Sequence, residues 1–306
     1  MATLARDRGR GGPAPHVGFG PTDVMLLGMA LIWGINFSVV KYGTQVVPAL
    51  AFNGARMVLA SAALGLLAWT RLRHIARRDL VALLLLGVLG NGVYQLLFVL
   101  GIERTRAGNA ALMLAATPAF IALIGWLRGV ERPTWRTMLG IVLSIAGIGI
   151  IVFSTAQGGN GSAGASLFGD LLVLGGCLAW AVYTVLLKPY SHRVDGIGLS
   201  AVTMMGGTVV LLMVAAPSMA RTGWDALPAG GWGAIVYSGL FALVVAYLFW
   251  YRGLRTLGPT RTAMYGNLQP VIALVVAWIT LGERPLLAQG VGAAAILAGL
   301  LLTRSS

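Results

Sequence analysis

Runs of about 20 mainly apolar residues follow one another along almost the whole chain, and a run of that length suits a helix that crosses a lipid bilayer. They predict spanning helices at 24–43, 47–70, 80–102, 107–127, 135–154, 169–187, 196–216, 231–251, 259–281 and 286–303. A β-barrel would need short segments of alternating apolar and polar residues, and runs such as LVALLLLGVLG at 80–90 do not alternate. The expected fold class is therefore an all-α integral membrane protein with ten transmembrane helices.

The composition argues against several other classes of protein. Charged residues make up 10% of the 306 residues and hydrophobic residues 58%, whereas soluble domains average about 25% charged residues. The net charge of +13 comes from short basic clusters between the apolar runs rather than from one patch. A soluble enzyme, a nucleic-acid-binding protein and a disordered chain are therefore not expected. The expected partners are a small-molecule substrate and membrane lipids.

The distribution of Lys and Arg predicts the orientation. Residues 1–22 are rich in Gly, Pro and Arg, lack an apolar stretch, and are expected to form a disordered cytoplasmic tail. With that end inside, most basic residues fall on the cytoplasmic side, and the outside holds Lys41, Arg104, Arg106, Arg221 and Arg284. This positive-inside bias predicts cytoplasmic N and C termini. Because the many Gly and Arg residues suggest a GC-rich bacterial genome, the expected location is the bacterial inner membrane.

The chain contains an internal repeat. Asp23, Trp33 and Lys41 recur 147 residues later as Asp170, Trp180 and Lys188, and WLRGVERP at 126–133 recurs as WITLGERP at 278–285. The prediction is two five-helix repeats, at 23–155 and 169–304, joined by a periplasmic linker at 156–168. Because five is odd, the second repeat enters the membrane from the opposite side. Inverted repeats are typical of secondary transporters, whose substrate site lies near the midplane between the halves.

Three stretches carry a resemblance to a known family: MLLGMALIWGINFSVVKYG at 25–43, TPAFIALIGWLRGVERP at 117–133 and QPVIALVVAWITLGERP at 269–285. They resemble EamA-type transporters of the drug/metabolite transporter superfamily, over about 24–303. The resemblance implies a ten-helix bundle that exports small metabolites, typically amino acids, as YddG-like aromatic amino acid exporters do. The superfamily also includes importers and nucleotide-sugar carriers, so the resemblance does not fix the substrate.

Two prolines occupy matched positions in the two repeats. Pro118 and Pro270 fall in the middle of predicted helices, and each prevents the hydrogen bond to the carbonyl four residues earlier. Those carbonyls belong to Leu114 and Gly266. Freed carbonyls at membrane depth could receive a substrate ammonium, or a local tight turn could satisfy them.

The candidate substrate-binding residues are polar and aromatic side chains that share helix faces in both repeats. Such side chains are the usual lining of a small-molecule pocket, although ordinary helix packing or an interfacial aromatic belt would also account for each one singly. The predicted set is Trp33, Asn36, Arg56, Asn91, Gln95, Met113, Thr117, Trp180, Tyr183, Tyr247, Tyr265 and Gln269.

Basic residues within or at the ends of the spans have two interpretations each. Arg56 lies well inside a span, where an ionisable residue is a functional candidate. It could receive a substrate carboxylate, or it could be a structural Arg tied to backbone carbonyls. Lys41 and Lys188 close their helices and are expected to bind helix C-terminal carbonyls. The alternative is that they bind a substrate carboxylate during opening.

The sequence offers no chemistry for catalysis or for a metal. His16, His74 and His192 lie in tails or loops, no Asp or Glu falls in the middle of a span, and Cys177 is the one cysteine. No cofactor, no metal and no enzymatic activity are expected, and the absence of a titrating group predicts facilitated diffusion or exchange rather than proton coupling.

The function predicted is export of small metabolites by alternating access, foremost amino acids with aromatic or other apolar side chains. The alternatives are an exporter of other metabolites or drugs and a membrane-embedded enzyme acting on lipid-like substrates. The small faces Gly140/Ser144/Gly147 and Gly292/Ala295/Gly299 would pack at the periphery or form a dimer contact, which leaves a monomer and a homodimer both open.

Overall fold

The computed structural model describes residues 20–128, 134–157, 163–191, 193–256, 262, 265–266 and 268–304. Within these ranges the regular elements are all helices. Seven helical segments are long and apolar enough to cross a membrane: Pro21–Val46, Ala49–Leu72, Arg77–Arg104, Ala107–Leu127, Leu167–Tyr190, Gly196–Ala220 and Ala229–Gly253. Three shorter apolar helices cover Met138–Phe153, Leu268–Leu281 and Leu287–Gly299. The chain is thus a multi-pass membrane protein.

The first half begins with two long helices, α1 (Pro21–Val46) and α2 (Ala49–Leu72). The run expected as one helix at 80–102 has three parts, with a π-helical turn in the middle: α3 (Arg77–Gly87), η1 (Val88–Val93) and α4 (Tyr94–Arg104). The run at 107–127 is also interrupted, at Ala116, and forms α5 (Ala107–Ala115) and α6 (Thr117–Leu127). The half ends with α7 (Trp135–Gln157).

The second half repeats this pattern. It comprises α8 (Ala163–Ser191), α9 (Gly196–Ala220), a short 3₁₀ turn η2 (Trp224–Ala226), α10 (Ala229–Val236), η3 (Tyr237–Val245), α11 (Ala246–Thr256), α13 (Leu268–Leu281) and α14 (Leu287–Arg304). Here too a π-helical segment, η3, interrupts the run expected as one helix at 231–251. Helices α7 and α8 extend into the 156–168 segment from both sides.

Both π-helical segments lie against the second helix of the opposite half. A Cβ atom on Gly87 would come within 2.1 Å of the carbonyl oxygen of Thr203 in α9, and one on Gly239 within 3.0 Å of the carbonyl oxygen of Arg56 in α2. Gly87 and Gly239 correspond in the repeat, and so do Arg56 and Thr203. Glycine at both positions lets the backbones of the two halves approach closely at the middle of the bundle.

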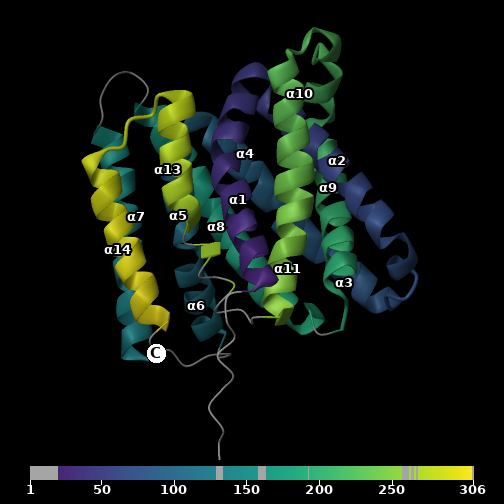
Figure 1. Ribbon diagram of the computed structural model, residues 1–306, viewed down its shortest axis with the longest axis horizontal. Coiled ribbons are helices and arrows are strands. Elements are labelled where there is room, and N and C mark those ends of the chain that lie inside the picture. Colours follow the sequence, from purple (N-terminus) through teal and green to yellow (C-terminus); the bar gives the residue numbers. More distant parts are fainter. Residues whose placement is uncertain are drawn as a thin grey trace, which may run out of the picture.

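Helices α7 and α14 form a pair at one edge of the bundle (Figure 1). The faces of small residues predicted on these two helices contact each other. A Cβ atom added to Gly147 would lie 2.7 Å from the carbonyl oxygen of Gly292, and a Cβ atom added to Gly299 would lie 2.4 Å from the carbonyl oxygen of Gly140. These faces therefore pack within one chain.

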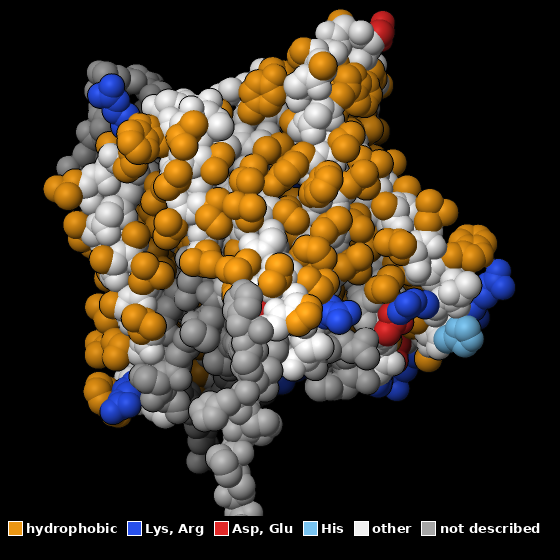
Figure 2. Space-filling view, in the orientation of Figure 1, with side chains coloured by type: hydrophobic (Ala, Val, Ile, Leu, Met, Phe, Trp, Pro, Cys, Tyr) orange, Lys and Arg blue, Asp and Glu red, His pale blue; other side chains and the backbone are white. Residues whose placement is uncertain are grey.

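Apolar side chains cover the flank of the bundle, and charged side chains gather at its two ends (Figure 2). This distribution fits a helical bundle whose sides face lipid. Helix α1 begins, and α14 ends, at the same end of the molecule (Figure 1). The second end carries the α1–α2 and α13–α14 connections.

Candidate substrate site between the two halves

Aromatic rings from both halves meet near the centre of the bundle. Trp33 of α1 lies 5.8 Å from Tyr247 of α11 between ring centroids, and Tyr247 lies 6.1 Å from Trp180 of α8. The Trp33 indole donates a 2.9 Å hydrogen bond to the carbonyl of Ala242 in η3. Trp33 and Trp180 correspond in the repeat, so the two predicted tryptophans flank one tyrosine at the interface between the halves.

The aromatic cluster continues along α4 and α8. Tyr94 lies 5.0 Å from Trp180 and 5.9 Å from Phe98, and Phe98 lies 5.8 Å from Phe37 of α1. Tyr183, one turn along from Trp180, lies 5.1 Å from it. The residues predicted from the sequence include Gln95 of α4 but not Tyr94. Its position four residues before Phe98, hence on the same helix face, is the signal that could have found it.

Arg56 is fully buried beside these rings. Its Nε donates to Asn53 Oδ1 at 2.8 Å, its Nη1 to Ser238 Oγ at 2.9 Å, and its Nη2 to Gln95 Oε1 at 2.5 Å. These three partners are neutral side chains, not the backbone carbonyls considered from the sequence.

The guanidinium of Arg56 also contacts two aromatic rings, with Cζ 5.8 Å from the centroid of Phe52 and 6.0 Å from that of Phe98. Within the part of the chain that the structure describes, Arg56 forms no ion pair with a carboxylate. A guanidinium has five N–H donors, and the three hydrogen bonds use three of them. A buried positive charge with two spare donors therefore lies between the halves.

The partners of Arg56 are themselves held in place. Asn53 donates from Nδ2 to the carbonyl of Gln95 at 3.0 Å, which ties α2 to α4. Ser238 belongs to η3 in the second half. Neither Asn53 nor Ser238 was predicted. Asn53 lies three residues before Arg56 and so on the same face of α2, whereas nothing local in the sequence points to Ser238.

Two buried asparagines, one in α1 and one in η1, also belong to the candidate site. Among the described residues, Oδ1 of Asn36 in α1 has no hydrogen-bond partner, and the amide of Asn91 in η1 has none apart from the nearby hydroxyl of Tyr183. Leaving a buried polar group unsatisfied costs about 1–3 kcal/mol. Asn91 and Asn36 therefore offer hydrogen-bonding groups that a bound molecule can satisfy.

The α5–α6 break lies next to α8. The N–H of Ala116 donates to the carbonyls of Met113 and Leu114, and the thiol of Cys177 contacts the carbonyl of Met113 at 3.6 Å. The carbonyl expected to be free at Leu114 thus has a local donor. Thr117 begins α6 directly after the break and lies against Cys177.

The remaining predicted residues contact helices around the central aromatic cluster. Tyr183 Oη is 3.4 Å from Oγ1 of Thr203, the repeat counterpart of Arg56. Tyr265 donates a 2.5 Å hydrogen bond to Asp23 at the start of α1. The carbonyl of Gln269 lies at the contact between α13 and α1. Pro270 lines a cavity of about 40 Å³ between α5, α13 and α14.

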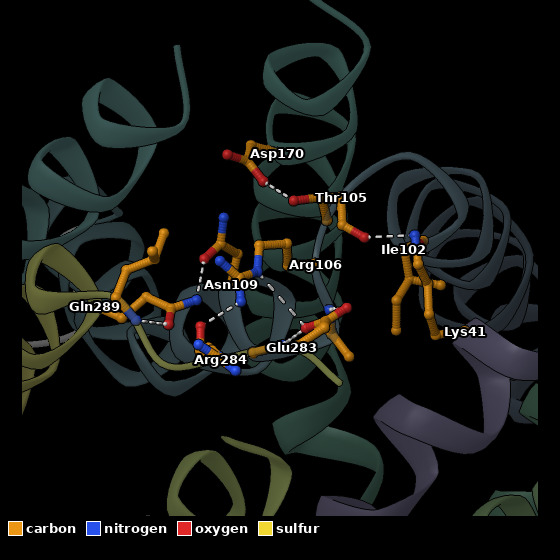
Figure 3. A network of polar contacts seen from close by, with 12 residues as sticks. Lys41, Ile102, Thr105, Arg106, Asn109, Asp170, Glu283, Arg284 and Gln289 are labelled. Carbon is orange, nitrogen blue, oxygen red and sulfur yellow. Dashed lines mark hydrogen bonds and ion pairs between the residues drawn. The ribbon is translucent and has the colours of Figure 1, made fainter. Parts of the chain in front are cut away.

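A network of polar contacts joins the halves at the end where α1 ends (Figure 3). Lys41 donates from Nζ to the carbonyls of Ile102, Glu103 and Thr105 at 3.0, 2.9 and 2.7 Å. Lys41 therefore binds C-terminal carbonyls, as expected, but those of α4 rather than of its own helix. The Thr105 hydroxyl donates to Asp170 of α8 in the other half.

The same network reaches the α13–α14 connection (Figure 3). Glu283 accepts hydrogen bonds from the N–H groups of Ala107 and Gly108 at 3.1 and 3.4 Å, and lies 3.9 Å from the guanidinium of Arg106. Arg106 donates to the carbonyl of Arg284 at 2.5 Å. The start of α5 is thereby fastened to the second half at this end of the bundle.

Comparisons with known proteins agree with this architecture. The sequence profile of the EamA-like transporter family matches twice, at residues 20–153 and 167–305. A probable terminal-alkyne amino-acid exporter of Streptantibioticus cattleyicolor is 30% identical over 88% of this chain and 89% of its own length. An uncharacterized transporter of Bacillus subtilis, YyaM, is 26% identical over 91% of this chain and 92% of its own length. One crystal structure shares the fold, with a TM-score of 0.63, 17% identity, and coverage of 92% of this chain and 95% of the other.

Proposed function

Since this chain belongs to the EamA-like transporter family, we propose that it exports small metabolites, foremost amino acids with aromatic or other apolar side chains, across the bacterial inner membrane. The observation that carries the substrate class is Arg56, a fully buried guanidinium bonded to neutral partners and surrounded by aromatic rings. The amino-acid exporter among the relatives supports the same class.

The proposed topology has ten membrane crossings, with both termini in the cytoplasm and two inverted repeats at 23–155 and 169–304. The double family match supports it, because each match covers one repeat. The corresponding positions of η1 and η3 support it further. The network around Lys41 and Glu283 then lies on the periplasmic side.

The proposed substrate places its carboxylate on the two N–H donors of Arg56 that the three side-chain hydrogen bonds leave over. Keeping a charge away from water is costly unless an opposite charge and hydrogen bonds compensate it. A substrate carboxylate supplies both. The substrate's apolar side chain would lie among Trp33, Trp180 and Tyr247, and Oδ1 of Asn36 is an acceptor for its ammonium.

Export proceeds by alternating access in this proposal, by uniport or exchange. Opening to the periplasm requires the bonds of Lys41 to the end of α4 and of Thr105 to Asp170 to break. The inverted repeat supplies the matching contact at the other end, because Asp23 corresponds to Asp170 and bonds Tyr265. Both carboxylate–hydroxyl contacts are formed in the structure, and in this proposal one of them breaks when the protein opens to the corresponding side.

The test is uptake of radiolabelled aromatic and aliphatic amino acids into liposomes that contain the protein. Each amino acid is compared with its amide derivative, in which a neutral carboxamide replaces the carboxylate. Saturable uptake of the acids without uptake of the amides supports the proposal. Arg56→Gln is expected to lower kcat/KM for the acids by about 30-fold or more, because removing one partner of a buried charge pair costs about 2–5 kcal/mol. Arg221→Gln, an exposed Arg outside the bundle centre, is the matched control.

Equal transport of acids and amides by the wild-type protein would contradict the role of Arg56 while leaving transport itself intact. Arg56→Lys separates charge from geometry, since lysine keeps the charge but cannot present the planar fork of donors. Thermal unfolding of each variant identifies a loss of activity that comes only from misfolding.

A further inference from the structure

The turn between α2 and α3 carries a dense group of basic side chains. Arg71, Arg73, Arg77 and Arg78 fall within eight residues of sequence, all exposed. The α2–α3 turn lies at the lower right of the bundle (Figure 1), where Lys or Arg side chains and a His side chain gather on the surface (Figure 2). This group, which we call the α2–α3 basic surface, lies at the end of α2, one of the helices long and apolar enough to cross a membrane.

Only part of this charge is neutralised by the protein. Arg71 pairs with Asp195 at 3.0 Å, and the nearby Arg193 pairs with Asp79 at 3.1 Å. Both acids of the surface are thereby engaged. Over the described ranges, Arg73, Arg77 and Arg78 form no ion pair with a carboxylate. Three exposed positive charges remain for a negatively charged partner.

An apolar face leads directly up to these charges. Leu66, Leu67 and Trp69 on the last turns of α2 are 78%, 52% and 61% exposed. The guanidinium carbon of Arg73 lies 5.8 Å from the centroid of the Trp69 ring. A tryptophan next to basic residues at the end of an apolar helix is typical of the boundary between the hydrocarbon and headgroup layers.

We propose that the α2–α3 basic surface binds the phosphate headgroup of an anionic phospholipid in the adjacent leaflet. The phosphate lies between Arg73, Arg77 and Arg78, and an acyl chain lies along Leu66 and Trp69. Charge complementarity selects an anionic lipid, because a zwitterionic headgroup offsets its phosphate with its own cation. The exposed apolar face selects a lipid over a soluble anion, because a soluble anion leaves that face uncovered.

The bound lipid has a defined place in the molecule. Arg71 and Arg193 link α2 and α3 of the first half to the α8–α9 connection of the second half. The lipid headgroup therefore lies beside the ion pairs that join the halves at this end. The inference stands on these contacts alone and does not depend on the substrate.

Native mass spectrometry of the purified protein tests the proposal by titration with dioleoyl phosphatidylglycerol and, separately, dioleoyl phosphatidylcholine. The wild-type protein is expected to bind the first phosphatidylglycerol more tightly than phosphatidylcholine. In the triple variant Arg73→Gln/Arg77→Gln/Arg78→Gln, phosphatidylglycerol binding is expected to fall about 100-fold, since each of the three basic residues near an anionic surface contributes roughly fivefold. The corresponding triple Lys variant is expected to retain most of the affinity.

The matched control is Arg128→Gln/Arg136→Gln/Arg252→Gln, which removes three exposed charges from other helices. It is expected to keep the preference for phosphatidylglycerol. An equal loss in both triple variants would mean that total charge, not this surface, attracts the lipid, and would overturn the proposal. Displacement of the lipid by glycerol phosphate at equal concentration would overturn it too, because a free anion would then be the ligand.

Discussion

Arg56 Nη2 donates a 2.5 Å hydrogen bond to Gln95 Oε1, which joins α2 to α4 in the centre of the bundle. The acceptor is neutral, so the guanidinium keeps its full charge for a third group. If Gln95 carried a carboxylate instead, the charge of Arg56 would be neutralised inside the protein. The identity of this one acceptor thus decides whether the site can hold an anion.

Gln95→Glu is expected to impair binding of carboxylate substrates while leaving the fold intact, because the new carboxylate pairs with Arg56. The KM for amino acids should rise about tenfold or more, on the scale of a lost buried charge contact. Transport assays in liposomes and thermal unfolding measure the two effects. An unchanged KM in a well-folded variant would show that substrates do not reach Arg56.

Asn91→Leu is expected to change stability and transport in opposite directions. Apart from the nearby hydroxyl of Tyr183, the amide of Asn91 has no hydrogen-bond partner among the described residues, and its repeat counterpart is Leu243. Replacing the amide with an apolar side chain should raise the free energy of unfolding by about 1–3 kcal/mol and lower the transport rate. Chemical denaturation in detergent and liposome uptake are the measurements. Lower stability would mean that Asn91 is already satisfied in the native protein.

Asp195 predicts a pH dependence of stability. Burial raises the pKa of Asp195, but hydrogen bonds from the N–H of Gly198 and from Arg71, the charge of Arg71 and the N–H of Ile197 together lower it below its ordinary value. Because the folded protein lowers this pKa, Asp195 stabilises the fold above the unfolded pKa of about 3.9. That contribution is lost as the pH falls through the folded pKa.

Asp195→Asn keeps a side chain that can cap α9 but removes the charge. The melting temperature of the variant should be lower than that of the wild-type protein near neutral pH, and the difference should disappear as the pH falls below about 3.9. A difference that stays constant from pH 7 to the acid range would show that the ionised carboxylate contributes nothing.

A substrate gradient alone is expected to drive transport. The acids nearest the centre, Asp23 and Asp170, lie close to the ends of their helices and form hydrogen bonds to Tyr265 and Thr105. Arg56 keeps its proton at working pH. An imposed pH gradient should therefore leave the initial rate of uptake nearly unchanged. Accumulation driven by a pH gradient and abolished by a protonophore would contradict this and direct attention to Asp23 and Asp170.

The helices could be predicted because length and hydropathy specify a membrane-spanning segment. The run at 24–43 corresponds to α1, which extends three residues further at each end, and the run at 47–70 corresponds to α2, which is shifted by two residues. The π-helical segments could not be predicted in the same way. An apolar run looks alike in α and π geometry, and the close approach of Gly87 to Thr203 involves a residue more than a hundred positions away.

The aromatic part of the candidate site followed from the repeat, since Trp33 and Trp180 correspond and lie on either side of Tyr247. The hydrogen-bond partners of Arg56 could not be predicted from the repeat. Its hydrogen-bond partners come from three separate elements, and Ser238 has no chemical signature of its own. Pairwise contacts between distant helices leave no periodic trace in one sequence.

Gly87, the last residue of α3 before η1, and Gly239 in η3 differ in one respect that bears on energetics. Gly87 leaves no room for a Cβ atom against Thr203, whereas Gly239 has 3.0 Å against Arg56. The two crossings between the halves are therefore unequal, although the sequence repeat makes them counterparts. If the halves were identical, the inward-open and outward-open conformations would be degenerate in free energy. In the proposed transport cycle, the closer crossing and the replacement of Arg56 by Thr203 in the second half would remove that degeneracy, and the resting population would then be biased toward one side of the membrane before any substrate binds.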